Sequence, residues 1–140
     1  MGLDNGIIIR GKTEKGTNYL KNNFSNCYDK YIEGFEFGYW RKCWNIRRKF
    51  IDDFGYDTER QEIKFELDDI PLIIETLKYF LNEDNWEYGK CYSQVFSWIE
   101  ELPSIANAMQ NLWRFYDNLD IDPNNELTDE DFEIYFYDSY

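Results

Sequence analysis

The strongest constraint on the fold is an aromatic and basic segment at residues 35–54, whose apolar side chains recur at the period of a helix. The apolar stripe consists of Tyr39, Cys43, Ile46, Phe50 and Phe54, and Trp40 and Trp44 widen it. Gly55 follows the segment, at a place that suits the left-handed residue with which many helices end. The pattern therefore predicts one amphipathic helix over residues 35–54.

The same segment concentrates positive charge. Five of the 15 lysines and arginines lie between residues 41 and 49, although the formal net charge of the chain is −13. In one interpretation the aromatic side chains are buried and the cations are solvated on the back of the helix. In the other, the segment lines a pocket for a flat, anionic ligand. This second interpretation assigns ligand binding to Tyr39, Trp40, Arg41, Lys42, Arg47, Arg48 and Tyr137.

Charge is divided unevenly along the chain. Residues 1–49 contain ten Lys and Arg against five Asp and Glu, and residues 50–140 contain five against 23, so +5 and −18 sum to the net charge of −13. An acidic surface repels the phosphate backbone, and we expect no direct binding of nucleic acid. Such a surface suits a basic protein partner, but it also serves solubility alone.

Three further segments predict the strands of a small β-sheet. One is a β-branched run between glycines, one alternates apolar and charged residues, and one is rich in strand-forming aromatic residues. In chain order these strands lie near residues 6–11, 62–67 and 132–138. The polar stretch at residues 12–34 shows no sustained period, and we interpret it as a long loop with a helical turn near residues 18–23.

Two more apolar stripes predict helices. The first covers residues 70–82. The second covers residues 95–116 and contains Pro103, where we expect a kink or a break. With the helix at residues 35–54 they give three main helices packed on the sheet. We therefore predict an α+β fold and a single domain spanning residues 1–140.

The sequence carries no signature of catalysis, so we expect a protein that is not an enzyme. The chain has no histidine, the commonest general base near neutral pH and the usual partner of a serine or cysteine nucleophile. Its three cysteines are far apart, at Cys27, Cys43 and Cys91. They lack the paired spacing of zinc ligands, and we expect no cofactor.

An acidic segment at residues 120–131 partly matches a calcium-binding loop. Asn125 stands where the loop requires glycine, and Asp131 stands where it requires a bidentate glutamate. These departures weaken the geometry that a hard cation needs. We interpret the segment as a solvated turn, with Thr128 capping a short helical turn, and assign no metal site.

Motifs at both ends and in the middle of the chain resemble a family of small tailed-phage proteins. The family begins Met-Gly-Leu-Asp, carries Gly-Tyr-Trp-Arg-Lys before a helix, and ends in an aromatic-serine-aromatic tail. The matching segments here are residues 1–4, 38–42 and 135–140. Tyr140 stands where the family often has tryptophan, and the basic run at residues 47–49 is not part of the family pattern. The resemblance implies a phage or prophage origin and supplies no mechanism.

A small phage protein without a catalytic signature is commonly an accessory factor that acts on the host. We expect it in the host cell cytoplasm, because the sequence shows neither a membrane span nor a leader. The main hypothesis is a sponge that sequesters a nucleotide-like anionic signal molecule in the aromatic and basic pocket. The alternative is an acidic nucleic-acid mimic that inhibits a basic host defence nuclease, such as a CRISPR effector. A homo-oligomer is compatible with the aromatic enrichment.

Overall fold

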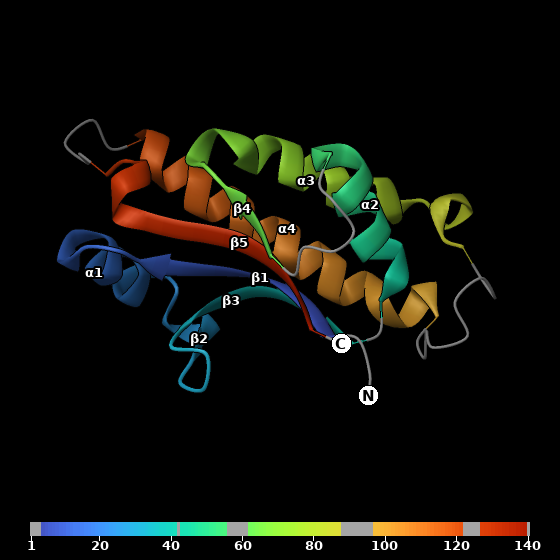
Figure 1. Ribbon diagram of the computed structural model, residues 1–140, viewed down its shortest axis with the longest axis horizontal. Helices are drawn as coiled ribbons and strands as arrows, with labels where there is room; N and C mark the ends of the chain where they lie inside the picture. The colour runs from blue at the N-terminus through green and yellow to red at the C-terminus, as the bar shows by residue number, and fades with distance from the viewer. Residues whose placement is uncertain (1–3, 42, 56–61, 88–96, 122–126, 140) are drawn as a thin grey trace.

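A five-stranded antiparallel sheet runs through the protein, with strand order β2-β3-β1-β5-β4 (Figure 1). The computed structural model describes residues 4–41, 43–55, 62–87, 97–121 and 127–139. The strands are β1 (Asp4–Gly11), β2 (Tyr28–Asp29), β3 (Gly34–Arg41), β4 (Glu62–Phe65) and β5 (Phe132–Ser139). The central strand β1 pairs with β3 on one side and with β5 on the other. Strands from both halves of the sequence therefore share one sheet.

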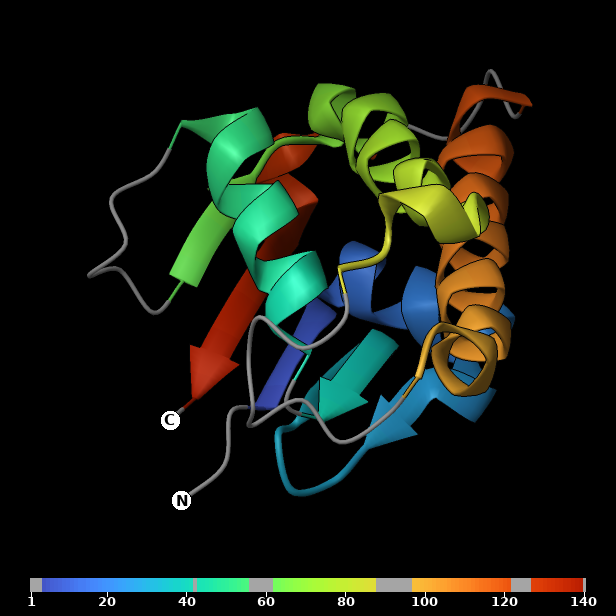
Figure 2. The same cartoon turned by 90° about the vertical axis from the view of Figure 1, so that its right-hand side faces the viewer.

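The larger helices gather on one face of this sheet, and Figure 2 shows the opposite face without a helix. The helices are α1 (Glu14–Asn23), α2 (Trp44–Phe54), α3 (Ile70–Lys78) and α4 (Trp98–Ile121). Short 3₁₀ turns lie between the helices and strands: η1 (Ser25–Cys27), η2 (Leu67–Asp69), η3 (Tyr79–Leu81), η4 (Glu83–Asn85) and η5 (Asp129–Asp131). Helices α2, α3 and α4 cover the sheet, and α1 lies at one end of it.

The fold is α+β, as the sequence predicts, and several local predictions are confirmed. Strands β1, β4 and β5 lie at the three predicted places. Gly55 ends α2 with φ 66°, the left-handed conformation that glycine adopts without strain. The Thr128 side chain caps η5. The break considered at Pro103 does not occur, because helix α4 continues through this residue.

Two predictions of local structure are wrong. Residues 35–41, predicted as the first part of a helix, belong to strand β3, and helix α2 covers only residues 44–54 of the predicted helix. Residues 12–34, predicted as a long loop with a helical turn near residues 18–23, contain the whole of helix α1, which includes that turn, and also η1, β2 and the start of β3. Thr13 begins α1 by accepting a hydrogen bond from the backbone N–H of Gly16. The apolar residues that show a helical period over residues 35–54 therefore belong to two consecutive elements, strand β3 and helix α2.

A β-bulge in β3 explains why the buried residues of this strand show a helical spacing. Ile7 pairs with Gly38 and Ile8 pairs with Glu36, so Phe37 is an extra residue in the ladder. Strict alternation would send two residues that are three positions apart, such as Phe37 and Trp40, to opposite faces of the sheet. Because of the bulge, Phe37 and Trp40 both point into the core. Their spacing of three residues is a helical spacing produced by a strand.

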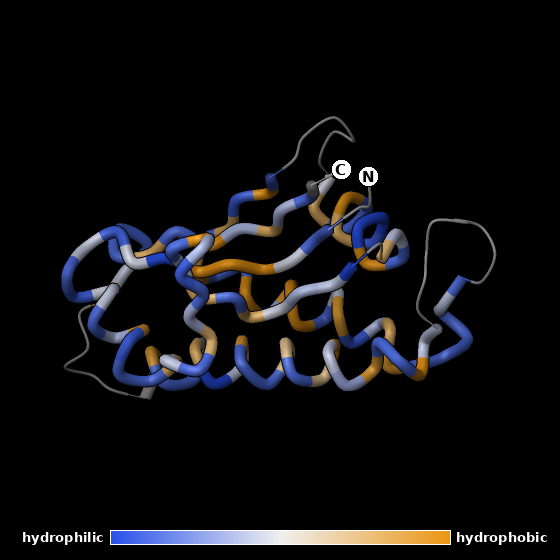
Figure 3. Tube along the Cα trace, turned by 90° about the horizontal axis from the view of Figure 1, so that it is seen from below, coloured by the Kyte–Doolittle hydropathy of each residue, from blue (hydrophilic) through white to orange (hydrophobic). Residues whose placement is uncertain are grey.

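The core lies between the sheet and its helices. Figure 3 shows α4 as a layer along one side of the sheet and the isoleucine run of β1 as a hydrophobic stretch inside it. Aromatic rings fill much of this layer: Phe50 of α2 stacks on Phe136 of β5, with ring centroids 4.4 Å apart and planes 6° apart. Phe24 and Phe115 extend the same cluster toward α1. This packing fixes α2 and α4 relative to β3, where the candidate site lies.

Candidate functional site

The structure divides the predicted binding segment into two parts. Tyr39, Trp40 and Arg41 end strand β3, whereas Arg47 and Arg48 lie on α2. The predicted site residue Lys42 lies outside the described residues. The segment therefore does not present its rings and cations on one helical face, and each residue needs its own account.

Trp40 is a core residue. Its side chain is 1 % exposed, and its ring lies over Gly38 and close to Ala108 of α4. A Cβ atom on Gly38 would stand 2.6 Å from the indole, so glycine permits this close approach. The indole Nε1 is buried without a hydrogen-bond partner among the described residues. Its ring face is not available for stacking on a ligand, contrary to the sequence hypothesis.

Arg47 is also occupied inside the protein. Its Nε donates to Oδ2 of Asp138 at 2.8 Å, and the two side chains are 10 % and 3 % exposed. Burial raises the pKa of Asp138, and the Arg47 guanidinium opposes that rise without cancelling it. The pair joins α2 to β5. Arg47 therefore holds the fold together, and the expectation that it binds a ligand is not supported by its position.

Arg48 is exposed but forms an ion pair with Glu87, which follows η4 in the chain. Its Nη1 donates to Oε2 of Glu87 at 2.8 Å, and Asn45 exchanges hydrogen bonds with the backbone of the same glutamate. The adjacent hollow, which also borders Lys49 and Tyr79, has a volume of only about 90 Å³. This hollow is too small for a nucleotide, because ligand pockets typically measure about 300–1,000 Å³. Arg48 thus lies outside the best candidate site.

The best candidate site is a surface hollow of about 470 Å³ between the end of β3 and the first turns of α4. We call it the β3–α4 hollow. Its lining residues are Tyr39, Trp40, Arg41, Glu100, Glu101 and Ser104. Helix α4 is held against β3 there, because the Ser104 hydroxyl donates to the backbone oxygen of Tyr39 at 3.3 Å. The Tyr39 ring is 41 % exposed and Arg41 is exposed, so a ring and a guanidinium are both accessible.

The α4 side of the hollow contributes an acid that sequence reasoning missed. Glu101 is 8 % exposed. Burial, and to a lesser degree the neighbouring Glu100, raises the pKa of Glu101 to about 7. A signal for it exists in the sequence, because Glu101 interrupts the apolar stripe formed by Trp98, Ile105, Ala108 and Leu112. A glutamate at a buried helical position indicates either a hydrogen-bonded partner or a site.

Glu101 should make the protein less stable as the pH rises from about 4.5 to about 7. In this window the folded protein keeps the Glu101 proton and the unfolded chain releases it, so unfolding becomes easier with increasing pH. Replacing the acid (Glu101→Gln) should remove this slope and raise the free energy of unfolding at about pH 8 by roughly 1–3 kcal/mol. Urea unfolding at about pH 5.5 and about pH 8 measures both effects.

The matched control for this prediction is Glu75→Gln on α3. Glu75 is 66 % exposed and approaches Lys78 only to 4.0 Å, so its removal should leave the pH slope unchanged. An unaltered slope in the Glu101 variant would show that Glu101 is solvated and ordinary.

Tyr137 lies away from the β3–α4 hollow, on the helix-free face of the sheet. Its ring covers Gly6 of β1, since a Cβ there would stand 2.8 Å from the ring. Tyr39 and Tyr137 both pair with Gly6, one from each neighbouring strand, and so point to the same face. Burial raises the pKa of Tyr137, with smaller contributions from Glu36 and Tyr39. Of the predicted residues, the structure thus groups Tyr39 with Arg41 and, separately, with Tyr137.

Other kinds of site find little support in the described part of the chain. Within it, no cluster of three or more His, Cys, Asp or Glu side chains is arranged to hold a metal ion. Part of the possible calcium loop, residues 122–126, lies outside the described residues, as does Cys91. Cys27 and Cys43 are buried free thiols. Among the described helices, none combines the length and the apolar character needed to cross a bilayer.

The chain matches no protein-family model, no curated protein and no solved structure.

Proposed function

We propose that this is a non-catalytic binding protein that sequesters a nucleotide-like molecule in the β3–α4 hollow. The observation that carries the proposal is the size and lining of this hollow: about 470 Å³, with the Tyr39 ring, the Arg41 guanidinium and the Glu101 carboxyl around it. Its volume is in the range of small-molecule sites. The combination supplies a stacking surface, a cation and a hydrogen-bonding group in one place.

Each lining group suits a different part of a nucleotide. An exposed tyrosine ring stacks on a base, and a guanidinium holds a phosphate through two parallel hydrogen bonds. The carboxyl groups of Glu100 and Glu101 oppose a free inorganic anion by like-charge repulsion, but a carboxylate accepts hydrogen bonds from the N–H groups of a base. We therefore favour a ligand that carries a base and few phosphates over phosphate alone.

The resemblance to small tailed-phage proteins gives this binding a biological role. A phage protein in the host cytoplasm that captures a nucleotide signal would keep that signal from activating host defence. Sequestration requires affinity and not turnover, which agrees with a chain that contains no histidine. We propose that the protein acts in this way, as a stoichiometric sponge.

The test is a binding screen with cyclic dinucleotides and cyclic ADP-ribose isomers, followed by thermal shift and calorimetry. Removing the guanidinium (Arg41→Ala) should weaken binding of the best ligand by about tenfold or more, because a charge-assisted pair contributes about 1.5–3 kcal/mol. The matched control is Arg48→Ala, which removes the same group from a pair with Glu87 outside the hollow. This control should bind normally.

Two outcomes would contradict the proposal. If no nucleotide in the screen shifts the melting temperature of the wild-type protein, the sponge is excluded. If the Arg48 variant loses as much affinity as the Arg41 variant, binding depends on overall charge and not on the hollow. A time course in which the ligand is consumed would identify an enzyme instead.

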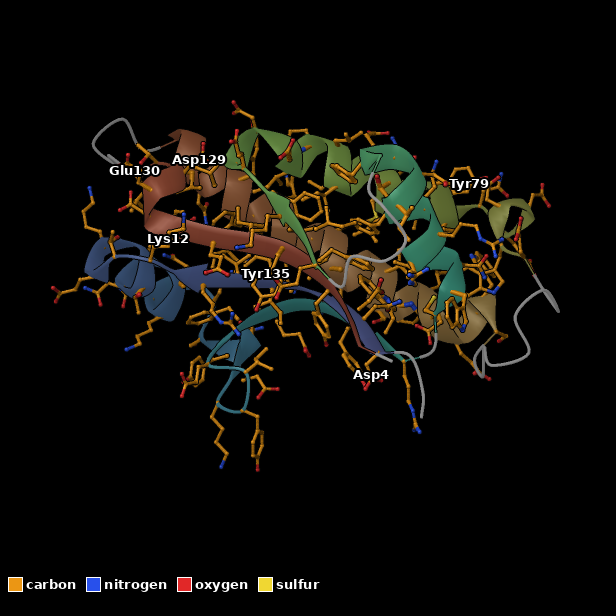
Figure 4. All side chains as sticks on the ribbon, viewed as in Figure 1. Asp4, Lys12, Tyr79, Asp129, Glu130 and Tyr135 are labelled. Atoms are coloured by element: carbon orange, nitrogen blue, oxygen red, sulfur yellow. The ribbon has the colours of Figure 1, made fainter. Side chains whose placement is uncertain are left out.

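A second candidate, an acidic protein inhibitor, is favoured by one corner of the molecule. The backbone N–H of Leu67 donates to Oδ1 of Asp129 at 2.6 Å, which brings η2 beside η5. The corner gathers five acids: Glu66, Asp68, Asp69, Asp129 and Glu130. Figure 4 shows Asp129 and Glu130 there, with Lys12 nearby. Inhibition of a basic nuclease by this route should weaken steeply with salt, unlike binding in a hollow.

A further inference from the structure

The helix-free face of the sheet, which we call the open face, is covered mainly by its own side chains. Its central residues are Gly6, Ile8, Arg10, Glu36, Tyr39, Tyr135 and Tyr137. Ile8 and Tyr135 are only 3 % and 4 % exposed, although no helix lies over them. Figure 4 shows Tyr135 over the middle of the sheet. A shallow hollow of about 320 Å³ borders Ile8, Arg10, Tyr135 and Tyr137.

The bulge in β3 brings Glu36 to this face beside Tyr39. Glu36 pairs with Ile8, and Tyr39 pairs with Gly6, so the two side chains stand on the same side of β1. Tyr137 approaches from the other side of the same strand. The phenol of Tyr39 donates to Oδ1 of Asp4 at 3.0 Å, which adds a second carboxylate at that end of the face. Two phenol rings and two carboxylates thus lie together.

Glu36 lacks a positive partner there. It is partly buried, and desolvation and the charge of Asp29 raise its pKa. No ion pair joins Glu36 to another residue within the described ranges. The closest candidate by register, Arg10, is otherwise engaged: its Nη2 donates to the backbone oxygen of Ile32 at 2.6 Å, and its guanidinium lies 5.2 Å from the Tyr135 ring centre. Glu36 is a desolvated carboxyl that a cation would stabilise.

The whole open face is more acidic than basic. Alternation along the strands assigns eight charged residues to it: Asp4, Asp29, Glu36, Glu62 and Glu133 against Arg10, Arg41 and Lys64. Exposed tyrosine rings attract cations through their faces, and tyrosine and arginine are enriched where proteins meet. Charge and ring chemistry therefore both select a basic partner.

We propose that the open face is a docking surface for a basic protein segment, which inserts an arginine or lysine side chain against Glu36 between Tyr39 and Tyr137. The cation would restore the charge balance of Glu36 and lie against the two rings. Tyr39 borders both sites, but Glu36 does not line the β3–α4 hollow, so substitution of Glu36 tests this interaction without altering the lining of the hollow. The two proposals can therefore fail separately.

The test uses a short unstructured peptide of alternating arginine and serine as the probe, with a glutamate–serine peptide as the negative control. In the wild-type protein, NMR titration with the arginine peptide should shift the resonances of Glu36, Tyr39 and Tyr137. Neutralising the acid (Glu36→Gln) should weaken binding by at least about tenfold, because a desolvated charge pair loses a partner. The isosteric glutamine keeps the shape of the side chain.

The matched control is Glu14→Gln, which removes one exposed acid from α1 outside the open face. It should change peptide affinity less than twofold, roughly the effect of one exposed charge. Equal weakening by both variants, or wild-type shifts confined to other surfaces, would overturn the docking proposal. Nucleotide binding should be unchanged in the Glu36 variant and weakened in the Arg41 variant, which distinguishes failure of the docking proposal from failure of the sponge.

Discussion

Truncating the buried indole (Trp40→Ala) should lower the free energy of unfolding by about 3–5 kcal/mol, the cost of removing a large aromatic side chain from a packed core. Trp40 is 1 % exposed, and its ring lies over Gly38, close to Ala108. A domain of this size is stable by only about 5–15 kcal/mol, so the loss is a large fraction of the total. We expect a melting temperature lower by roughly 10 °C or more, measured by calorimetry or circular dichroism.

The neighbouring substitution Tyr39→Ala is the matched control. Tyr39 is 41 % exposed, and its removal should cost less than about 1 kcal/mol while it weakens ligand binding. If Trp40 were a stacking residue of the site, the pattern would reverse, and the Trp40 variant would fold normally but bind poorly. The pair of variants therefore distinguishes a core tryptophan from a ligand-binding one.

Breaking the buried ion pair (Asp138→Ala) should cost about 3–5 kcal/mol, because it leaves the Arg47 guanidinium uncompensated inside the protein. The pair spans 91 positions in the sequence, is only 2.8 Å long, and ties α2 to β5. Urea unfolding of the single variant measures the loss. An exposed pair gives the comparison: Arg48→Ala breaks the contact with Glu87 and should cost less than about 1 kcal/mol.

Replacing both partners with apolar residues, as in Arg47→Met with Asp138→Leu, should restore most of the lost stability. A buried ion pair contributes little beyond what well-packed apolar residues supply, whereas half of a pair is costly. Binding of nucleotide should survive in this double variant if Arg47 has only a structural role. If the double variant is as stable as the wild-type protein but no longer binds nucleotide, Arg47 takes part in ligand binding.

The sequence predicted those parts of the fold whose pattern is local. The isoleucine run of β1 and the alternation of β4 are strand patterns over their own length, and Gly55 and Thr128 act on adjacent residues. The α+β class followed from these elements. The boundary between β3 and α2 did not, because apolar residues spaced by three occur on both sides of it.

The candidate site was predictable only in part. The sequence pointed to Tyr39 and Arg41 through the contrast between local basic residues and an acidic chain, and the structure places both at the β3–α4 hollow. It could not assign Glu101 or Ser104, which α4 brings to β3 from more than 60 positions away. It also could not show that Arg47 is satisfied by Asp138 and not by a ligand.

By itself, the amino-acid order determined which segments are amphipathic, where several of them begin and end, and that the chain is strongly acidic around a basic segment. Tertiary structure alone decided which neighbours in that segment are core and which are surface. One extra residue in the ladder at Phe37 turns Trp40 inward and Glu36 and Tyr39 outward. Register and long-range pairing set these directions, and neither leaves a periodic trace in the sequence.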